Sequence, residues 1–199
     1  LFLTFPAELV PRRLRIEVDE RISRDGDVIV PIDVEKVRAA VSTLVDEGIT
    51  AVAVCFLHSY KKPTHEQAVR DLIRAEFDSL SVSISSDVQP QLREYERTST
   101  TVANAYVQPL VERYIANLEQ AFAQQGFQGR FHLVQSSGGL ISPAAAVEFP
   151  VRLLESGPAG GGQATAYLGR LLNCPDVISF DMGGTTAKAC LIQNGEADV

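Results

Sequence analysis

The chain lacks the cysteine pairs that mark a disulfide-rich domain or a zinc knuckle. Its three cysteines, Cys55, Cys174 and Cys190, are far apart in 199 residues. An odd number of widely spaced cysteines argues against both a disulfide framework and a structural zinc site. The pattern therefore indicates a reducing, cytoplasmic compartment. Cys55 lies inside an apolar run and is expected to be a buried structural thiol.

Positive charge and long apolar runs are also scarce. The chain has 18 Lys and Arg residues against 25 Asp and Glu, which gives a net charge of −7. Nucleic acid and anionic membranes are therefore not expected as partners. No apolar run approaches the roughly 20 residues that a membrane-spanning helix needs. The hydrophobic content of 45% is enough for one large core or two small ones.

Both ends of the chain predict an internal fragment. Segment 1–6 has neither an initiator Met nor the basic start of a signal peptide. Segment 194–199 stops just after a hairpin-like turn. We therefore expect a piece of a longer protein.

Residues 1–85 show the alternating helix and strand patterns of an α/β domain. Asp33 has the side chain of a helix N-cap, and Gly48 can end the same helix. Thr64 is expected to start the next helix, with Gln67 as its capping-box partner. The expected elements are a hairpin, a helix, a strand buried on both faces, a second helix and a short strand, over residues 14–30, 33–48, 49–57, 64–77 and 81–85.

A polar stretch at 86–92 marks the expected boundary between two domains, 1–85 and 86–199. The second domain should begin with a helix over 97–125, which Pro109 is expected to kink or split. Two strands are expected further on, over residues 131–135 and 176–181.

The most informative stretch is a Gly-Gly turn between two apolar runs near the end of the chain. It contains Asp181, Gly183, Gly184, Thr185 and Thr186. Glycine lets backbone amides approach an oxyanion, and the threonine hydroxyls add donors. Asp181 has the carboxylate that a hydrated magnesium ion prefers. The residues predict a phosphate-binding turn on a β-hairpin, and they are equally compatible with a hairpin turn that binds nothing.

Two further Gly-rich segments, 138–139 and 157–162, are expected to follow strands. Because ligands bind beyond the carboxyl ends of strands in open α/β sheets, the three segments together predict one crevice, with three independent tight turns as the alternative. A loop is expected over residues 155–162, followed by a helix through Leu172. The segment from Ser156 opens that helix, where free amides favour an anion. Its glycines serve close helix packing equally well.

Two polar segments could have a functional role, but each also has a simpler structural explanation. His58, His65 and Glu66 do not have the spacing of a zinc-binding helix, and Glu66 fits a first-turn partner of the helix dipole. The mixed charges of segment 93–97 are typical of a solvated or ion-paired stretch, with a supporting or interface role as the alternative.

Four motifs occur in an order that resembles one protein family. They are Arg93–Tyr106, Gln135–Gly139, Ser156–Gly161 and Asp181–Thr186. The segment His58–Glu66 fits the same family. Over essentially its whole length the chain is similar to the hydantoinase/oxoprolinase family, the A-type subunit of N-methylhydantoinase.

The resemblance implies an α/β fold of the actin/hexokinase-like (ribonuclease H-like) class, present here as an incomplete nucleotide-binding fold. Residues 1–85 would end the family's N-terminal domain, and residues 86–199 would start its core domain. The implied activity is the ATP- and magnesium-dependent opening of cyclic amides such as 5-oxoproline or hydantoins, with a B-type hydantoinase subunit as partner. Two alternatives stay open: a subunit of an ATP-dependent ketone carboxylase, and a non-enzymatic actin-like nucleotide-binding domain.

The resemblance also implies a nucleotide site, with Asp181 as its metal ligand and no catalytic base assigned. The expected nucleotide-binding residues are Gly157, Gly160, Asp181, Gly183, Gly184, Thr185, Thr186 and Lys188.

Two departures from the family pattern bear on this site. The commoner family form has an aspartate where Lys188 stands, and a lysine there contacts phosphate or marks a different subgroup, because it cannot ligate magnesium. The family's other phosphate loop, an Asp-x-Gly-Gly-Thr, has no match in the chain. These 199 residues alone are therefore not expected to turn over ATP.

Overall fold

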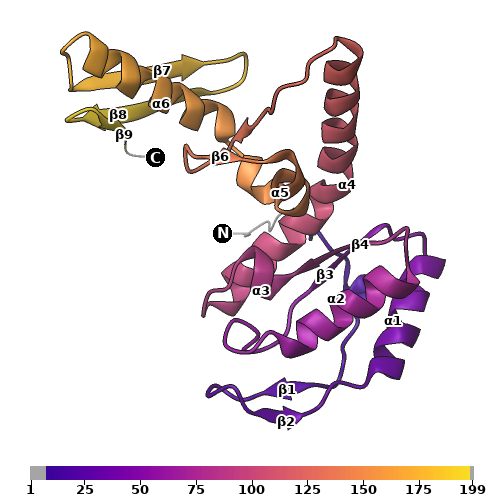
Figure 1. Cartoon of the computed structure of the whole chain (residues 1–199). Coiled ribbons are helices and arrows are strands. Elements are labelled where there is room, and N and C mark those ends of the chain that lie inside the picture. The colour runs from indigo at the N-terminus through magenta and orange to yellow at the C-terminus, as the bar shows by residue number, and fades with distance from the viewer. Residues whose placement is uncertain (1–7, 198–199) are drawn as a thin grey trace, which may run out of the picture. The chain divides into compact units, whose positions relative to one another are not determined.

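The computed structural model of the chain describes residues 8–197. They form two compact units that divide after Leu110, inside the long helix α4 (Glu94–Gln124) (Figure 1). Both units combine helices with strands, which confirms the expected α/β class. Among the described residues, no helix is long and apolar enough to cross a membrane.

Unit 1 follows the expected order of elements with shorter strands. They are η1 (Arg12–Leu14), β1 (Arg21–Ile22), β2 (Val28–Val30), α1 (Val34–Asp46), β3 (Ala51–Val54), α2 (Thr64–Glu76), β4 (Ser81–Ile84), α3 (Ser85–Val88) and the first part of α4. The hairpin expected over 14–30 pairs only β1 with β2, because Leu14 belongs to η1 instead.

The cap and the end of α1 are as the sequence predicts. One carboxylate oxygen of Asp33 accepts hydrogen bonds from the amides of Glu35 and Lys36, at 3.1 and 3.3 Å. Gly48 follows the helix with φ +78°, a left-handed conformation that glycine adopts without a steric penalty. The helix therefore begins and ends where local side-chain chemistry requires it.

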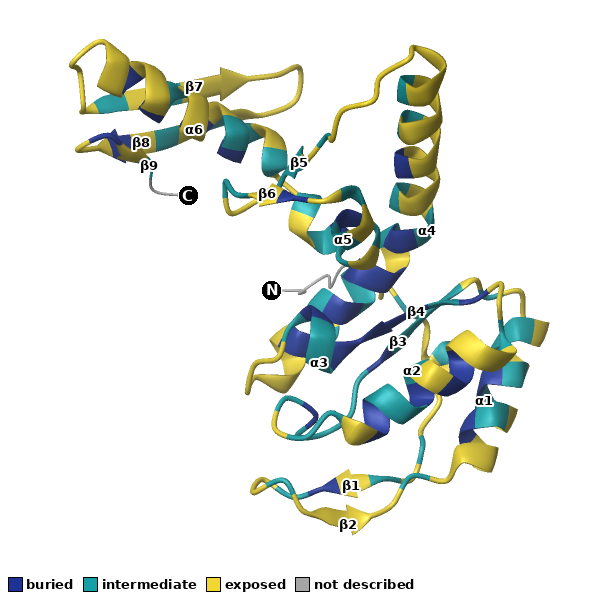
Figure 2. Cartoon of the chain, viewed as in Figure 1, coloured by how far each residue is buried: buried dark blue, intermediate teal, exposed yellow. Residues whose placement is uncertain are grey.

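Strands β3 and β4 are parallel and in register from Ala51 opposite Ser81 to Val54 opposite Ile84, with α2 as the connection between them. Apolar side chains from α1, α2 and both strands form the core, which Figure 2 shows as dark blue segments. β3 is shorter than the strand expected over 49–57 and is mostly half-buried rather than buried on both faces. The chain leaves the sheet after Val54, and the amide of Phe56 donates to the Glu66 side chain instead of to a neighbouring strand.

Helix α2 starts at Thr64 as predicted, but its cap differs from the prediction. Thr64 is the first helical residue rather than the cap, and Pro63 occupies the cap position without a side-chain hydrogen bond. The predicted capping box is therefore wrong. Glu66, expected as a simple dipole partner, is instead completely buried.

A buried chain of hydrogen bonds connects α4 to the ends of both strands. The Arg97 guanidinium donates to the Ser59 hydroxyl. The Ser59 and Ser85 hydroxyls lie 3.0 Å apart, and Ser85 donates to the Glu66 carboxylate at 2.6 Å. Because Ser85 donates to Glu66, Ser59 must donate to Ser85, so the chain runs in one direction from cation to anion.

The two charged ends of this chain also bind backbone groups. Glu66 accepts from the amides of Phe56 and Ser86, both at 2.8 Å. Arg97 donates to the carbonyl of Phe56 at 2.9 Å, and its guanidinium lies 5.7 Å from the ring centre of Tyr60. Arg97 is only 1% exposed, so segment 93–97 is not the fully solvated stretch that its charges suggested. These contacts hold the start of α4 against the sheet of unit 1.

The Cys55 thiol lies beside the same polar cluster. Burial, followed by the nearby Glu66 carboxylate, raises the pKa of the Cys55 thiol to about 12. The thiol therefore stays protonated at any physiological pH. This agrees with its expected role as a structural thiol.

Unit 2 begins in α4, which runs through Pro109 without being split there. Its other elements are β5 (Leu133–Val134), β6 (Leu140–Ile141), α5 (Pro143–Glu148), η2 (Pro150–Leu153), α6 (Ser156–Leu171), β7 (Val177–Met182), β8 (Ala187–Gln193) and β9 (Glu196–Ala197). Strands β7, β8 and β9 form an antiparallel sheet, and α6 packs on one face of it. The other face of β7 is apolar and exposed, with Ile178 66% and Phe180 65% accessible.

Two predictions for unit 2 are wrong. The segment before Ser156 is the 3-10 helix η2 rather than a strand. Residues 157–162 are not a loop, because α6 already begins at Ser156. The glycines of this segment therefore belong to the first turns of a helix.

The buried carboxylate gives a stability prediction. We expect Glu66→Gln to lower the free energy of unfolding by roughly 3 kcal/mol, because the amide removes the charge and places a donor against donors. Glu119→Gln, at an exposed position of α4, should change it by less than about 0.5 kcal/mol. Urea unfolding followed by circular dichroism measures both variants. Equal midpoints for the two would show that the buried carboxylate is not a stabilising centre.

Candidate functional site

The predicted turn is a four-residue connection between β7 and β8. The last strand pair joins Met182 to Ala187, and the amide of Gly183 donates to the carbonyl of Thr186 at 3.0 Å. The four connecting residues, Gly183, Gly184, Thr185 and Thr186, are all exposed. The hairpin that the sequence predicts is confirmed, and its hydroxyls and remaining amides face solvent.

The two glycines of the turn have no structural reason to be glycine within the described chain. Neither Gly183 nor Gly184 has φ in the left-handed region. A Cβ at Gly184 would meet nothing within 4 Å, and one at Gly183 would only touch the carbonyl oxygen of Thr186 at 4.0 Å. Backbone conformation and packing therefore do not explain these two glycines. Glycine also lets a ligand approach the backbone closely, and an oxyanion is a ligand that backbone amides bind in this way.

Glycines of α6 have the opposite property. A Cβ at Gly162 would lie 3.1 Å from the sulfur of Cys190, and one at Gly169 would lie 2.7 Å from the carbonyl oxygen of Cys174. These residues therefore let α6 approach the sheet closely, so the packing interpretation holds for them. Gly160 makes an ordinary contact with Val134, and nothing lies near Gly157.

The contacts of α6 also set its direction over the hairpin. Gly169 faces Val177 at the start of β7, and Gly161 faces Ser179 in the middle of that strand. The N-terminus of α6 is therefore at the same end as the Gly183–Thr186 turn (Figure 1). Gly157, one residue into the helix, is exposed at that end.

The third Gly-rich segment also touches α6. Gly138 adopts φ +77° in the turn between β5 and β6, and a Cβ there would lie 2.8 Å from the side-chain nitrogen of Gln163. Segment 138–139 therefore contacts the helix in which residues 157–162 lie. A crevice shared by all three stays a prediction.

Charged groups surround the turn. Asp181 and Lys188 are directly opposite each other in the β7–β8 ladder. Lys188 forms an ion pair with Glu155, the residue before α6. Within residues 8–197, the exposed Asp181 carboxylate has no ion pair or hydrogen-bond partner. Glu155 was missing from the predicted site, because its segment was interpreted as a loop and no local pattern links it to Lys188.

A magnesium ion fits this arrangement only together with a phosphate. No group of three or more His, Cys, Asp and Glu side chains in the described part of the chain could hold a metal. Magnesium needs few protein ligands, because it keeps several waters and takes oxygens from phosphates. One free carboxylate at the end of a strand, beside a turn with exposed donors, meets that requirement. The binding roles of all the predicted site residues stay predictions.

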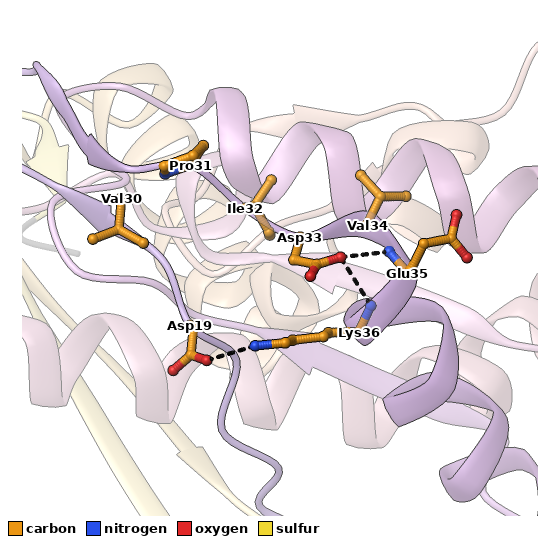
Figure 3. A pocket seen from close by; sticks show the side chains of 8 residues that line it. All are labelled: Asp19, Val30, Pro31, Ile32, Asp33, Val34, Glu35 and Lys36. Atoms are coloured by element: carbon orange, nitrogen blue, oxygen red, sulfur yellow. Dashed lines mark hydrogen bonds and ion pairs between the residues drawn. The ribbon is translucent and has the colours of Figure 1, made fainter.

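The histidines of unit 1 are engaged in other contacts. His58 bonds to the carbonyl of Ile22 at 2.9 Å, and His65 bonds to the carboxylate of Glu20 at 2.7 Å. A surface hollow between β2 and the start of α1 is also in unit 1 (Figure 3). Asp19 and Lys36 form an ion pair on its wall at 3.1 Å, and none of the predicted site residues lines it.

Two glycine positions provide a matched test of the packing on α6. Gly169→Ala should destabilise the protein by about 1–3 kcal/mol, because a methyl group would collide with a backbone carbonyl. Gly157→Ala should leave stability unchanged or raise it slightly, because its surroundings are open and alanine favours a helix. Thermal unfolding measures both changes. A loss of stability in Gly157→Ala as large as in Gly169→Ala would contradict the described packing.

Two family models match the chain in order. The hydantoinase/oxoprolinase N-terminal region matches residues 1–77, and the hydantoinase/oxoprolinase domain matches residues 97–199. The predicted domain boundary between 85 and 86 lies in the interval between the two matches, while the compact units divide after Leu110. The boundary itself stays a prediction.

Relatives and solved structures cover nearly all of the chain. Caprolactamase subunit alpha of Pseudomonas jessenii is 37% identical over 190 residues, which are 96% of this chain and 27% of that subunit. The 5-oxoprolinase of Saccharomyces cerevisiae is 32% identical over 174 residues, 86% of this chain and 13% of that protein.

The structural matches are equally extensive. The crystal structure of the ATP-dependent caprolactamase from Pseudomonas jessenii has a TM-score of 0.86 at 37% identity, over 96% of this chain and 28% of that one. The nucleotide-free structure of acetone carboxylase has a TM-score of 0.84 at 31% identity, over 97% of this chain and 28% of that one. The chain thus spans just over a quarter of these two structures. From the order of its motifs, the fold of both units and the two matched domain models, the chain belongs to the hydantoinase/oxoprolinase family.

Proposed function

We propose that the full-length protein opens cyclic amides in a reaction driven by ATP. Family membership supports this, as do relatives whose names include an ATP-dependent caprolactamase and a 5-oxoprolinase. The observation that carries the nucleotide role is the exposed β7–β8 turn, where neither backbone conformation nor packing explains Gly183 and Gly184. Because the chain spans only part of its relatives, the activity is assigned to the longer protein.

The turn acts by binding and orienting a phosphate chain. Exposed amides of the turn and the hydroxyls of Thr185 and Thr186 donate hydrogen bonds to phosphate oxygens. Asp181 holds a hydrated magnesium ion, and amides at the open N-terminus of α6 near Gly157 add positive potential. ATP supplies the phosphoryl group that turns the amide oxygen into a leaving group. No residue of the chain is assigned as catalytic base.

The fold class and the partner subunit are proposed from the resemblance to the family. We assign the chain to the actin/hexokinase-like class as an incomplete nucleotide-binding fold, whose second phosphate loop lies elsewhere in the full-length protein. Several relatives are named as subunits, which supports a B-type partner subunit. The free cysteines Cys55, Cys174 and Cys190 support a cytoplasmic location.

Two substitutions test the turn in the full-length protein. Asp181→Ala and Gly184→Ala should each weaken ATP binding about tenfold or more in titration calorimetry with magnesium, because one removes a metal ligand and the other places a methyl group against the phosphates. Gly184→Ala should unfold at the wild-type temperature, because its surroundings are open. Unchanged ATP affinity in both variants would contradict the proposed role of the turn in nucleotide binding.

A second function, ketone carboxylation, is favoured by the match to acetone carboxylase. Phosphate release measured with a panel of lactams, hydantoins and ketones separates the two functions. A cyclic amide hydrolase should release phosphate without bicarbonate, whereas a carboxylase should need bicarbonate for coupled turnover. Turnover of a ketone that depends on bicarbonate would replace the proposed function with the second one.

A further inference from the structure

We propose that Glu155 is a positioning residue that holds the Lys188 ammonium away from Asp181 and so keeps the Asp181 carboxylate available for magnesium. The inference rests on the proposed function, because it concerns the metal ligand of the β7–β8 turn. It adds a residue that belongs to none of the motif positions expected to bind phosphate.

The first observation is that a carboxylate lies directly opposite Lys188 in the β7–β8 ladder. Asp181 and Lys188 are directly opposite each other in antiparallel strands. Side chains in such a pair lie on the same face of the sheet with their Cβ atoms about 5 Å apart, and opposite charges there attract. A cross-strand ion pair between them is therefore the arrangement that sheet geometry favours.

The second observation is that Lys188 pairs with Glu155 instead. The ammonium contacts the Glu155 carboxylate, while Asp181 has no partner among the described residues. The lysine side chain is 36% exposed and the glutamate side chain 68% exposed, so solvent and phosphate can still reach the pair. Asp181, which lies in β7 beside the turn, is thus left without a counter-charge from the described part of the chain.

The third observation concerns the backbone at Glu155. This residue is the N-cap of α6 and adopts a left-handed conformation, with φ 63° and ψ 18°. Short Asp, Asn, Ser and Thr side chains commonly accept hydrogen bonds from helix amides at this position, and the longer Glu155 side chain makes no such bond. Its carboxylate is directed to Lys188 rather than to its own helix, which leaves the first amides of α6 without a side-chain cap.

As a consequence, Glu155 neutralises Lys188, and Asp181 stays available beside the turn. With Glu155 present, the lysine charge is balanced at the end of α6, and Asp181 keeps its full negative charge for a cation. Without the Glu155 carboxylate, Lys188 turns back to its cross-strand neighbour. Magnesium must then displace an ammonium group from Asp181, and more magnesium is needed to support ATP binding.

The experiment uses the full-length protein, with AMPPNP as the ATP analogue to prevent turnover. The magnesium concentration that supports half-maximal AMPPNP binding is measured by titration calorimetry. Glu155→Gln should raise this concentration roughly three- to fivefold, the size expected of one partly exposed ion pair. Thermal unfolding of each variant confirms that the fold is kept, and Glu119→Gln serves as the matched control.

The double variant Glu155→Gln/Lys188→Met is the decisive one. It should restore the wild-type magnesium midpoint, because no ammonium is left to occupy Asp181. A single variant with an unchanged midpoint overturns the inference. So does a double variant that stays as weak as the single one, because Glu155 would then act directly on the metal.

The outcome for Asp181→Ala separates this inference from the proposed function. If Asp181→Ala changes magnesium-dependent binding and Glu155→Gln does not, only the positioning role of Glu155 fails. If Asp181→Ala itself has no effect, the metal role of the turn fails, and the inference fails with it.

Discussion

Unit 1 depends on a buried relay of hydrogen bonds between the Arg97 guanidinium and the Glu66 carboxylate. Two serine hydroxyls connect the opposite charges, so that neither charge is left alone in the interior. Isolated buried charges cost many kcal/mol, and hydrogen bonds to an opposite charge and to polar groups offset part of that cost. The relay is also located where the parallel strands end, and there the amides of Phe56 and Ser86 no longer have partners in a sheet. One carboxylate satisfies both amides, which explains why β3 stops early and why α4 is held at this edge.

Unit 2 uses a different constraint, the close approach of a glycine-containing helix to a hairpin. Gly162 and Gly169 leave no room for a side chain between α6 and its neighbours. This fit fixes the direction of α6 and brings its first residues to the turn end of the hairpin. The ion pair between Glu155, the residue before α6, and Lys188 of β8 joins the same helix to the same hairpin.

Glycines in this chain thus have two separable roles. Where a missing Cβ makes room for a backbone or side-chain neighbour, as at Gly169, packing explains the residue. Where no neighbour exists and φ is ordinary, as at Gly184, packing does not explain it. The same distinction applies to acidic residues. Glu66 satisfies buried amides, whereas Asp181 is exposed and has no partner among residues 8–197. This difference makes Asp181 the better candidate for a cation.

The sequence alone determined the features that depend on neighbours in the chain. Periodicity and turn chemistry are local. They predicted the cap at Asp33, the turn before β8 and the alternation of helix and strand, and the family motifs could be recognised in the sequence itself. The burial of Glu66 and Arg97 was not predictable, since their serine partners lie 19 and 38 residues away in sequence. The pairing of Lys188 with Glu155, rather than with its ladder neighbour, was equally hidden. Only the tertiary structure decides such pairs, because it brings distant charges into contact and excludes water around some of them.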